Sequence, residues 1–377
     1  MLPFFVMDLF KEYFSKKKGY RFVERSSMIN EWNDKDFNKS IGDVIKRELK
    51  SGFPIKEVKK DDKFAVIQPC IRFDDLNYLR KNKEKSSKLT CFTTLCSVIA
   101  SSKNTPNREE VEHKLLMESV EFFNSLGISK DQLKIHYFNG GSVKQITNNK
   151  VNIDFEIEPD KIVQYAEKLG FKKEQFFHYK KGDIKNVFML SLRGKFNYVG
   201  YRSEIFFCRG TNSNEMIEIA TLQYYPYISV WEGNNIKEIK RADSFLAGHS
   251  FGLERIVWAL SEEESIFKTQ SIFPLYDYIS RYIKDKGRAA VLTDAILAFH
   301  LLVSDIYKYK INPTQMQKQK IQTYLELITS GLSTLNYPDI KTFVKECFHI
   351  SSHIRPYLQL DEFVDIAAEK VLENIPH

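Results

Sequence analysis

The spacing of hydrophobic residues changes along the chain and predicts helices and strands in different places. Large apolar side chains recur at helical spacing in residues 8–17, which predicts an amphipathic packing helix. Two apolar, β-rich runs follow, FAVIQPCIRF from Phe64 and LTCFTTLCSVIA from Leu89. The basic stretch at residues 80–88 separates these runs, so we expect two strands joined by a mobile, charged loop.

Strand-like segments dominate the middle of the chain, and helical segments dominate the rest. Residues 108–126 have helical spacing, with Gly127 at the position of a C-terminal cap. Short apolar or alternating runs then predict a long antiparallel region, with one helix near residues 160–169. Beyond this region the spacing is helical to the end of the chain. We therefore expect an α+β fold, an antiparallel sheet flanked by helices in residues 1–268 and an all-helical domain in residues 269–377.

The composition is that of a globular protein with many large packing residues. Hydrophobic residues make up 43% and charged residues 28% of the 377 residues, which excludes a disordered, collagen-like or disulfide-scaffold chain. The net charge of +7 gives a mildly basic surface. Such a surface favours anionic partners such as nucleotides, RNA or an acidic carrier protein, but charge alone does not choose among them.

The cysteines and the N-terminal segment indicate a cytoplasmic protein. The five cysteines form no C-x-x-C pair and no even set, so we expect reduced thiols. The N-terminal apolar run is broken by Asp8 and Lys11, and no cleavage-site pattern follows it. We therefore expect neither a signal peptide nor a membrane span.

Three residues of the two β-rich runs form a candidate anion site. Arg72 stands in an otherwise apolar strand, where a charge must be paired or must bind a ligand. Lys88 lies four residues before Phe92 on the next strand, and alternation places both on one face. If the strands pair as a hairpin, all three residues share that face. Cations beside an aromatic ring suit a nucleoside triphosphate.

A second candidate segment, GHSFGLERI, spans residues 248–256, where strand spacing gives way to helical spacing. Its glycines allow close approach of the backbone to a ligand, and Arg255 follows Glu254 at the start of the predicted helix. Each of these features is common by itself. Their order along the chain is the informative signal.

In this order, the features resemble motif 2 and motif 3 of class II aminoacyl-tRNA synthetases, and the chain is most similar to the catalytic core of alanyl-tRNA synthetase. The opening LFKEYFSKKKGYRFVERSSMI resembles that family's first helix and serine stretch. CIRFDDLNYL and LTCFTTLCSVIA resemble its motif 2 strands, and FGLERI resembles its motif 3. YRSEIFFCRG and EMIEIATLQYYPY resemble the strands of its amino-acid pocket. The resemblance covers about residues 8–320.

The resemblance implies ATP-dependent activation of an amino acid, in which a carboxylate oxygen attacks the α-phosphate and releases pyrophosphate. It implies that Arg72 holds the α-phosphate and the substrate carboxylate, that Phe92 stacks on adenine, and that Arg255 holds the γ-phosphate. The alternative for each is a structural ion pair or a core aromatic ring. The other implied ATP-binding residues are Lys88, Gly252 and Glu218, the last near a Mg²⁺ ion that bridges the phosphates.

The chain departs from the family in its amino-acid pocket. The family's motif 3 run D-T-G-M-G-L-E-R begins with an Asp that binds the substrate ammonium, and here Gly248 stands at this Asp and Ser250 at the first Gly. Either Asp243 or Glu232 replaces that carboxylate, or the substrate is not a simple α-amino acid bound in the usual way. The resemblance implies alanine, and these departures widen the expected substrate to alanine or a related small or unusual amino acid. The other pocket residues implied by the resemblance are Phe188, Thr221 and Gln223.

A second departure concerns RNA and metal. Residues 311–324 lack the arginine pairs with which the family approaches tRNA, although Lys310, Lys318 and Lys320 keep some positive charge. His349 and His353 are spaced for one helical face, but no second ligand pair accompanies them, so we expect no zinc.

Three interpretations follow. The first is a truncated, repurposed synthetase paralogue that passes the aminoacyl group to a carrier-protein thiol or a small-molecule amine. The second is a minimal tRNA-charging enzyme that reads only the acceptor end, using the basic residues 80–88 and the lysines of the helical domain. The third is a catalytically inactive regulatory or binding subunit.

Overall fold

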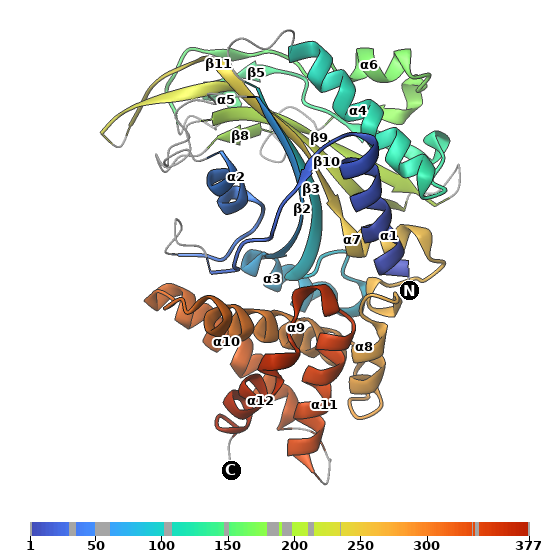
Figure 1. The fold of residues 1–377 in the computed structure, drawn as a ribbon, viewed down its shortest axis with the longest axis vertical. Helices are drawn as coiled ribbons and strands as arrows, with labels where there is room; N and C mark the ends of the chain where they lie inside the picture. The colour runs from blue at the N-terminus through green and yellow to red at the C-terminus, as the bar shows by residue number, and fades with distance from the viewer. Residues whose placement is uncertain are drawn as a thin grey trace.

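A mixed β-sheet and a group of helices below it form the part of the chain that the structure describes (Figure 1). The sheet occupies the upper half of the view, and helices α8 to α12 fill the lower half. The computed structural model describes residues 2–29, 35–49, 61–101, 108–146, 151–178, 188–190, 198–209, 215–233, 235–333, 335 and 339–375.

The central strands of the sheet are antiparallel. Along the main path the strand order is β1-β2-β3-β11-β10-β9-β4-β7, and β8 pairs with β9. The pairs β1–β2 and β4–β7 are parallel, and β5 and β6 form a small separate hairpin. The described strands are β1 (Arg21–Phe22), β2 (Asp62–Ile71), β3 (Cys91–Ser101), β4 (Leu133–His136), β5 (Gly141–Ser142), β6 (Glu156–Ile157), β7 (Phe176–Phe177), β8 (Phe188–Leu190), β9 (Tyr198–Cys208), β10 (Met216–Glu232) and β11 (Asn235–Gly252).

Helices flank the sheet and then form a layer of their own. Helices α1 and α4 lie beside the sheet, and α9 runs through the middle of the lower helices (Figure 1). The described helices are α1 (Leu2–Lys11), α2 (Gly42–Glu48), α3 (Leu76–Asn82), α4 (Arg108–Ser125), α5 (Val143–Ile146), α6 (Ile162–Lys168), α7 (Leu253–Leu260), α8 (Phe273–Ser280), α9 (Lys286–Tyr309), α10 (Gln315–Leu332), α11 (Ile340–His353) and α12 (Val364–Leu372).

The two faces of the sheet carry different side chains. His249 of β11 points toward α4, because its Nε2 lies 2.8 Å from the carbonyl oxygen of Leu115. Alternation along β11 turns Ser250 to the opposite face. There Ser250 stands in register with Thr221 of β10 and with Cys96 of β3. We call this side the pocket face.

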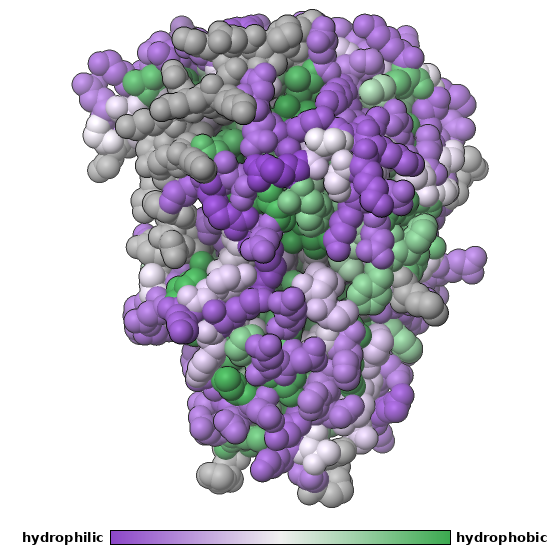
Figure 2. Space-filling view, viewed as in Figure 1, coloured by the Kyte–Doolittle hydropathy of each residue, from purple (hydrophilic) through white to green (hydrophobic). Residues whose placement is uncertain are grey.

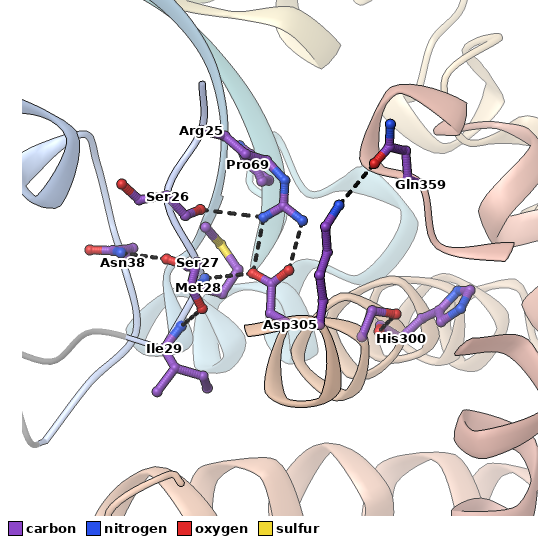
Figure 3. A network of polar contacts seen from close by, with 12 residues as sticks. Arg25, Ser26, Ser27, Met28, Ile29, Asn38, Pro69, His300, Asp305 and Gln359 are labelled. Carbon is purple, nitrogen blue, oxygen red and sulfur yellow. Dashed lines mark hydrogen bonds and ion pairs between the residues drawn. The ribbon is translucent and has the colours of Figure 1, made fainter. Parts of the chain in front are cut away.

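Buried carboxylates hold the helical region against the sheet. Asp294 of α9 accepts hydrogen bonds from the backbone N–H groups of Thr90, at 2.9 Å, and of Cys91, at 3.3 Å, where β3 begins. Asp305, also on α9, accepts both terminal nitrogens of Arg25 at 2.7 and 3.0 Å (Figure 3). Both carboxylates are completely buried. One buried ion pair and one hydrogen-bonded buried carboxyl therefore join the two regions in addition to apolar packing.

Helix α9 is the core of the helical region. Among the described helices it alone is long and apolar enough to cross a membrane by length and composition, but 89% of its most apolar stretch is buried within the fold. It contacts α8, α10, α11 and α12. Its apolar character is accounted for by this packing.

Most of the expected elements are present, and the expected fold class is confirmed as an antiparallel sheet flanked by helices with a helical region after it. The first helix is longer than expected, since α1 begins at Leu2 and continues into a π-helical turn over Glu12–Lys17. Helix α4 ends just before Gly127, which has a φ of +82° as expected of a helix cap. The division into domains at residues 268 and 269 stays a prediction.

The link between β2 and β3 is not the expected loop. Helix α3 and a 3-10 turn at Lys83–Lys85 occupy most of it. Leu76 and Leu79 lie one helical turn apart and are buried, which anchors α3 to the core. The basic residues that suggested a loop are mostly on its solvent side. Arg72 also differs, since it follows the last residue of β2 instead of standing inside the strand.

Polar residues cover most of the described surface on the side shown in Figure 2, and apolar residues gather in small groups between them. This distribution is usual for a globular fold, since single exposed apolar residues need no partner. The described surface on this side therefore gives no sign of a special function.

Candidate functional site

One pocket on the pocket face collects most of the candidate residues. It lies where β2 ends, β3 begins and β11 passes into α7, beside the first half of β10. Seven of the residues expected at the ATP and amino-acid site line it. These are Arg72, Phe92, Glu218, Thr221, Ser250, Gly252 and Arg255.

Arg72 and Phe92 meet because β2 and β3 are paired. Cys70 stands opposite Phe92 in the antiparallel register, and the N–H of Arg72 donates to the carbonyl of Thr90 at 2.8 Å. The Arg72 guanidinium lies over the Phe92 ring, 4.8 Å from its centre. This cation–π contact covers the ring face that a planar ligand would use. The charge expected near an aromatic platform is therefore in contact with it.

Arg255 and Glu218 form an ion pair in the same pocket. Helix α7 begins directly after β11, so Arg255 projects from the first turn of a helix toward β10. Its Nη1 donates to Oε2 of Glu218 at 2.7 Å, and Thr221 Oγ1 donates to Oε1 at 3.3 Å. The two charged side chains are 22% and 32% exposed, which leaves both accessible to a ligand.

The Glu218 carboxyl stays charged because three arginines surround it. Burial opposes the charged form of this carboxyl, but the charges of Arg255, Arg202 and Arg72 outweigh burial and lower its pKa below the usual value. Glu218 is therefore ionised at neutral pH. The carboxylate and the arginines Arg72 and Arg255 together can receive phosphates and a divalent cation.

Lys88 turns away from the phenylalanine platform. Its Nζ lies 3.3 Å from Oδ1 of Asp75 and 5.1 Å from the ring centre of Tyr78. Asp75 itself lines the pocket. Asp75 was not among the expected site residues, although it stands three residues after Arg72 in the run RFDD. Lys88 precedes β3, which begins at Cys91, so strand alternation does not place it beside Phe92, and it is not among the described lining residues.

The residues expected to bind the amino acid are divided between two adjoining depressions. Thr221 lines the first, whereas Gln223 and Gly248 line a second one under α2, and Ser250 belongs to both. In the second depression the Tyr225 hydroxyl donates to Oε1 of Gln223 at 3.2 Å. Ser250 is therefore the point where the two depressions meet.

Phe188 stays a prediction. It begins β8, where its backbone pairs with Tyr201 of β9. Its side chain lies outside the part of the chain that the structure describes.

Gly248 is required by the sheet itself. A Cβ atom on this residue would lie 2.3 Å from the carbonyl oxygen of Ser97 on β3, so any side chain here needs the backbone to move. Neither suggested replacement for the missing carboxylate lies among the described lining residues. Asp243 is exposed on β11, and Glu232 is 74% exposed near the tip of the β10–β11 hairpin, 3.6 Å from Lys237. The structure therefore speaks against a replacement by Asp243 or Glu232, and the alternative of an unusual substrate stays a prediction.

Two other carboxylates lie closer to the amino-acid residues. Glu218 accepts the hydroxyl of Thr221, and Glu204 of β9 stands directly opposite Thr221 in the register. Glu204 is buried and pairs with Arg202 at 3.0 Å and with Nδ1 of His136 at 3.2 Å. Sequence spacing did not reveal Glu204, because only the strand register brings it beside Thr221.

No family model matches the chain, and no curated protein matches it either. Solved structures with a distantly similar fold do exist. One is PylSc of Desulfitobacterium hafniense, a pyrrolysyl-tRNA synthetase, with a TM-score of 0.37 and 11% identity over 71% of this chain and 71% of that one. Another is an ATP phosphoribosyltransferase regulatory subunit/histidyl-tRNA synthetase from Bacillus halodurans C, with a TM-score of 0.39 and 11% identity over 70% and 80% of the two chains. Similarity this low assigns neither an activity nor a ligand to the chain.

The pocket residues fit Mg²⁺ only in company with a phosphate ligand. The described residues contain no group of three or more His, Cys, Asp or Glu side chains that could hold a metal ion. Mg²⁺ commonly needs just one or two carboxylates when phosphates and water supply its other ligands. Glu218 and Asp75, which both line the pocket, satisfy that requirement. Outside the pocket, His349 and His353 are exposed, with ring centres 6.5 Å apart.

Proposed function

We propose that the chain uses ATP to activate an amino acid as an aminoacyl-adenylate. The observation that carries the proposal is the meeting of Arg72, Phe92, Glu218 and Arg255 in one pocket of an antiparallel sheet. These residues come from four different elements or element ends. The charged side chains are partly exposed in the pocket and are not needed to fill the hydrophobic core, so a ligand explains their presence better than packing does.

ATP binding in this proposal exchanges the partners of the two arginines. Arg72 leaves the Phe92 ring for the α-phosphate and the substrate carboxylate, and adenine takes the ring face. Arg255 leaves Glu218 for the γ-phosphate, which frees the carboxylate to face Mg²⁺. Both exchanges replace one paired contact with another, so no guanidinium is left without a partner.

The reaction needs positioning and charge neutralisation more than a general base. A carboxylate oxygen of the amino acid forms a bond to the α-phosphorus, and the bond from that phosphorus to the bridging oxygen breaks, releasing pyrophosphate. Negative charge grows on the phosphate oxygens, where Arg72 and Arg255 would stabilise it. Bound Mg²⁺ would supply further charge neutralisation at the phosphates. Gly252 has room beside Arg255, since a Cβ there would lie 3.6 Å from that side chain.

The amino acid would lie toward Thr221 and Ser250, with its side chain directed to the second depression at Gln223. We propose a small or unusual amino acid, because Gly248 cannot carry the family's carboxylate without a shift of β3. Glu218 and Glu204 are the carboxylates beside Thr221 that remain for an ammonium group.

We propose an acyl acceptor other than tRNA, either a carrier protein or a small molecule. Lys320, one of the lysines expected to keep charge for RNA, is instead paired with Asp36 at 2.9 Å and lies over the Phe73 ring at 5.2 Å. That pairing lowers the charge which α10 can offer to a phosphate backbone. Transfer to tRNA is the competing outcome of an acceptor assay. We place the activity in the cytoplasm, in keeping with five free, buried thiols.

The test is ATP/pyrophosphate exchange with the twenty amino acids and with β- and D-amino acids, without tRNA. We expect exchange with one substrate class. Arg72→Ala and Arg255→Ala should each lower the exchange rate by about 100- to 1,000-fold, the usual loss for one charge-stabilising donor. Arg281→Ala is the matched control, because Arg281 pairs with Asp277 on the surface of α8. Exchange retained in both pocket variants would overturn the assignment of Arg72 and Arg255 to the site. A folded wild type that binds no ATP would overturn the proposed activity.

A further inference from the structure

Arg355 brings the end of the chain to the back of the pocket. It stands between α11 and α12, immediately before the 3-10 turn Pro356–Leu358, and is only 2% exposed. Its Nη1 donates to Sγ of Cys91 at 3.0 Å, and its Nη2 donates to the carbonyl of Cys91 at 3.2 Å. Nη2 also lies 3.4 Å from Oε1 of Glu254. Arg355 therefore contacts both β3 and α7, the two elements that carry Phe92 and Arg255.

The contacts of this segment surround Phe92 on both sides. Cys91, which precedes Phe92, accepts a hydrogen bond from Arg355. Thr93, which follows Phe92, shares a hydrogen bond of 2.8 Å with the hydroxyl of Tyr357. The N–H of Thr93 donates to Oε2 of Glu254 at 2.8 Å. Both neighbours of the aromatic platform are thus fixed by the C-terminal segment, directly or through Glu254.

Glu254 links this network to the arginine expected at the γ-phosphate. It lines the pocket, is 2% exposed, and directly precedes Arg255 in the first turn of α7. Burial raises the pKa of the Glu254 carboxyl, and Arg355 and the Thr93 N–H are the partners that oppose this rise. Loss of Arg355 would leave Glu254 without its cation, one residue from Arg255.

We infer that Arg355 and Tyr357 are positioning residues that set Phe92 and Arg255 for ATP, which makes the C-terminal helical region a working part of the nucleotide site. The inference rests on the proposed ATP site. Neither residue touches the ligand in this account. They act through the ends of β3 and α7 that bear the pocket side chains.

The pair Arg25–Asp305 supplies a matched control. It joins the N-terminal segment beside the sheet to α9 of the helical region (Figure 3). Its side chains are 11% and 0% exposed, comparable to the 3% and 3% of Arg355 and Glu254. Asp305 also accepts the N–H of Met28 at 2.7 Å, but neither member of this pair lines the pocket. Among the described contacts, Arg25 and Asp305 share no hydrogen bond with Arg355, Tyr357 or Glu254, although Arg25 is close enough to Tyr357 for their charges to interact.

The experiment compares Arg355→Met, Arg355→Lys and Tyr357→Phe with Arg25→Met in the full chain. The readouts are the melting temperature, the Kd for ATP by calorimetry, the KM for ATP in pyrophosphate exchange, and amide hydrogen exchange of residues 91–95. We expect Arg355→Met to raise the Kd and KM for ATP at least tenfold and to speed exchange of these amides. Arg355→Lys should recover part of the loss, and Tyr357→Phe should raise the KM about threefold with little change in melting temperature. Arg25→Met should lower the melting temperature but leave the Kd within twofold.

Each outcome decides between the two proposals. Equal Kd values for ATP in Arg355→Met and Arg25→Met would overturn the positioning role while leaving the ATP site intact. A folded wild type that binds no ATP would overturn the ATP site, and the positioning role with it. If Arg355→Met does not fold, Tyr357→Phe decides, and an unchanged KM together with unchanged exchange of residues 91–95 would overturn the role.

Discussion

The pocket and the boundary between the sheet and the helical region both contain arginine–carboxylate pairs, but the pairs differ in exposure. Arg255 and Glu218 in the pocket are 22% and 32% exposed. Arg25 and Asp305 at the boundary are 11% and 0% exposed, and Asp305 also accepts a backbone N–H group. A partly exposed pair can be reached by a ligand that offers new partners, whereas a fully buried pair is costly to break. The same residue types are therefore accessible in one region and enclosed by the fold in the other.

Removing one partner at the boundary is the strongest test of this difference. Asp305→Ala leaves the Arg25 guanidinium and the Met28 N–H buried without a carboxylate, so we expect a loss of about 3–5 kcal/mol in the free energy of unfolding. Urea denaturation measures it. Replacing both partners, in Arg25→Met with Asp305→Leu, should recover most of the loss. A double variant as unstable as the single one would contradict this account.

Lowering the pH should weaken the buried core while the pocket keeps its charge. Burial lowers the pKa of His249 to about 3 and that of His300 to about 3. Between pH 6.5 and 3 the unfolded chain binds protons that the fold excludes, so stability falls as the pH falls. Burial also raises the pKa of Asp294 to about 6, which favours the fold as the pH drops from 6 toward 4. Burial likewise raises the pKa of Glu118 and of Glu254, so these carboxyls also offset part of the histidine effect.

Each histidine contributes a loss of about 2 kcal/mol in the free energy of unfolding between pH 7 and pH 5, and the raised carboxyls cancel part of the sum. We therefore expect a lower free energy of unfolding at pH 5 than at pH 7. Urea midpoints at the two pH values measure it. His249→Gln removes one of the two histidine contributions and should shrink the difference by about 2 kcal/mol. Glu218 stays ionised over this range, because its pKa is lowered by the neighbouring arginines in spite of burial. Identical urea midpoints at pH 5 and pH 7 would refute the prediction.

Two glycines sharpen the contrast between the sheet and the pocket rim. Gly248→Ala would place a Cβ 2.3 Å from the Ser97 carbonyl oxygen, which forces β3 and β11 apart, and we expect a cost of about 1–3 kcal/mol. Gly252→Ala would place its Cβ 3.6 Å from Arg255, an ordinary contact, so its stability should stay within about 0.5 kcal/mol. Thermal unfolding of the two variants tests the difference. Equal melting temperatures would show that the strands yield at residue 248.

Lys88→Ala should have the smallest effect. Lys88 is 42% exposed and pairs with Asp75 at 3.3 Å. We expect a stability change below about 1 kcal/mol, as for other surface pairs. The Kd for ATP should rise no more than about threefold, because Lys88 pairs with the lining residue Asp75 and is not itself among the described lining residues. A rise of tenfold or more in calorimetry would restore Lys88 to direct contact with the triphosphate.

Local pattern was sufficient to predict the helices, the paired strands and the meeting of Arg72 with Phe92. The hairpin register alone brings those two residues together. Residues 76–85 were misjudged because their basic side chains outweighed the two buried leucines, Leu76 and Leu79, which anchor a helix there.

Other parts of the site had no local signal. Arg355 carries no motif, and its partners Cys91 and Glu254 are 264 and 101 residues away along the chain. Asp294 and Asp305 did have one, since a carboxylate in an apolar helix must be paired. That signal identifies a buried carboxyl that needs a partner, but only the tertiary fold shows which residue the partner is.

The contact between Arg355 and Glu254 also has a consequence for biosynthesis. Glu254 leaves the ribosome 101 residues before its cation does. At about 5–20 residues per second, the buried carboxylate waits about 5–20 s for its partner during each round of translation. Throughout that interval α7 and the start of β3 lack one of the contacts that fix them. The nascent chain should therefore complete the contacts behind the pocket late, after most of the sheet has been made.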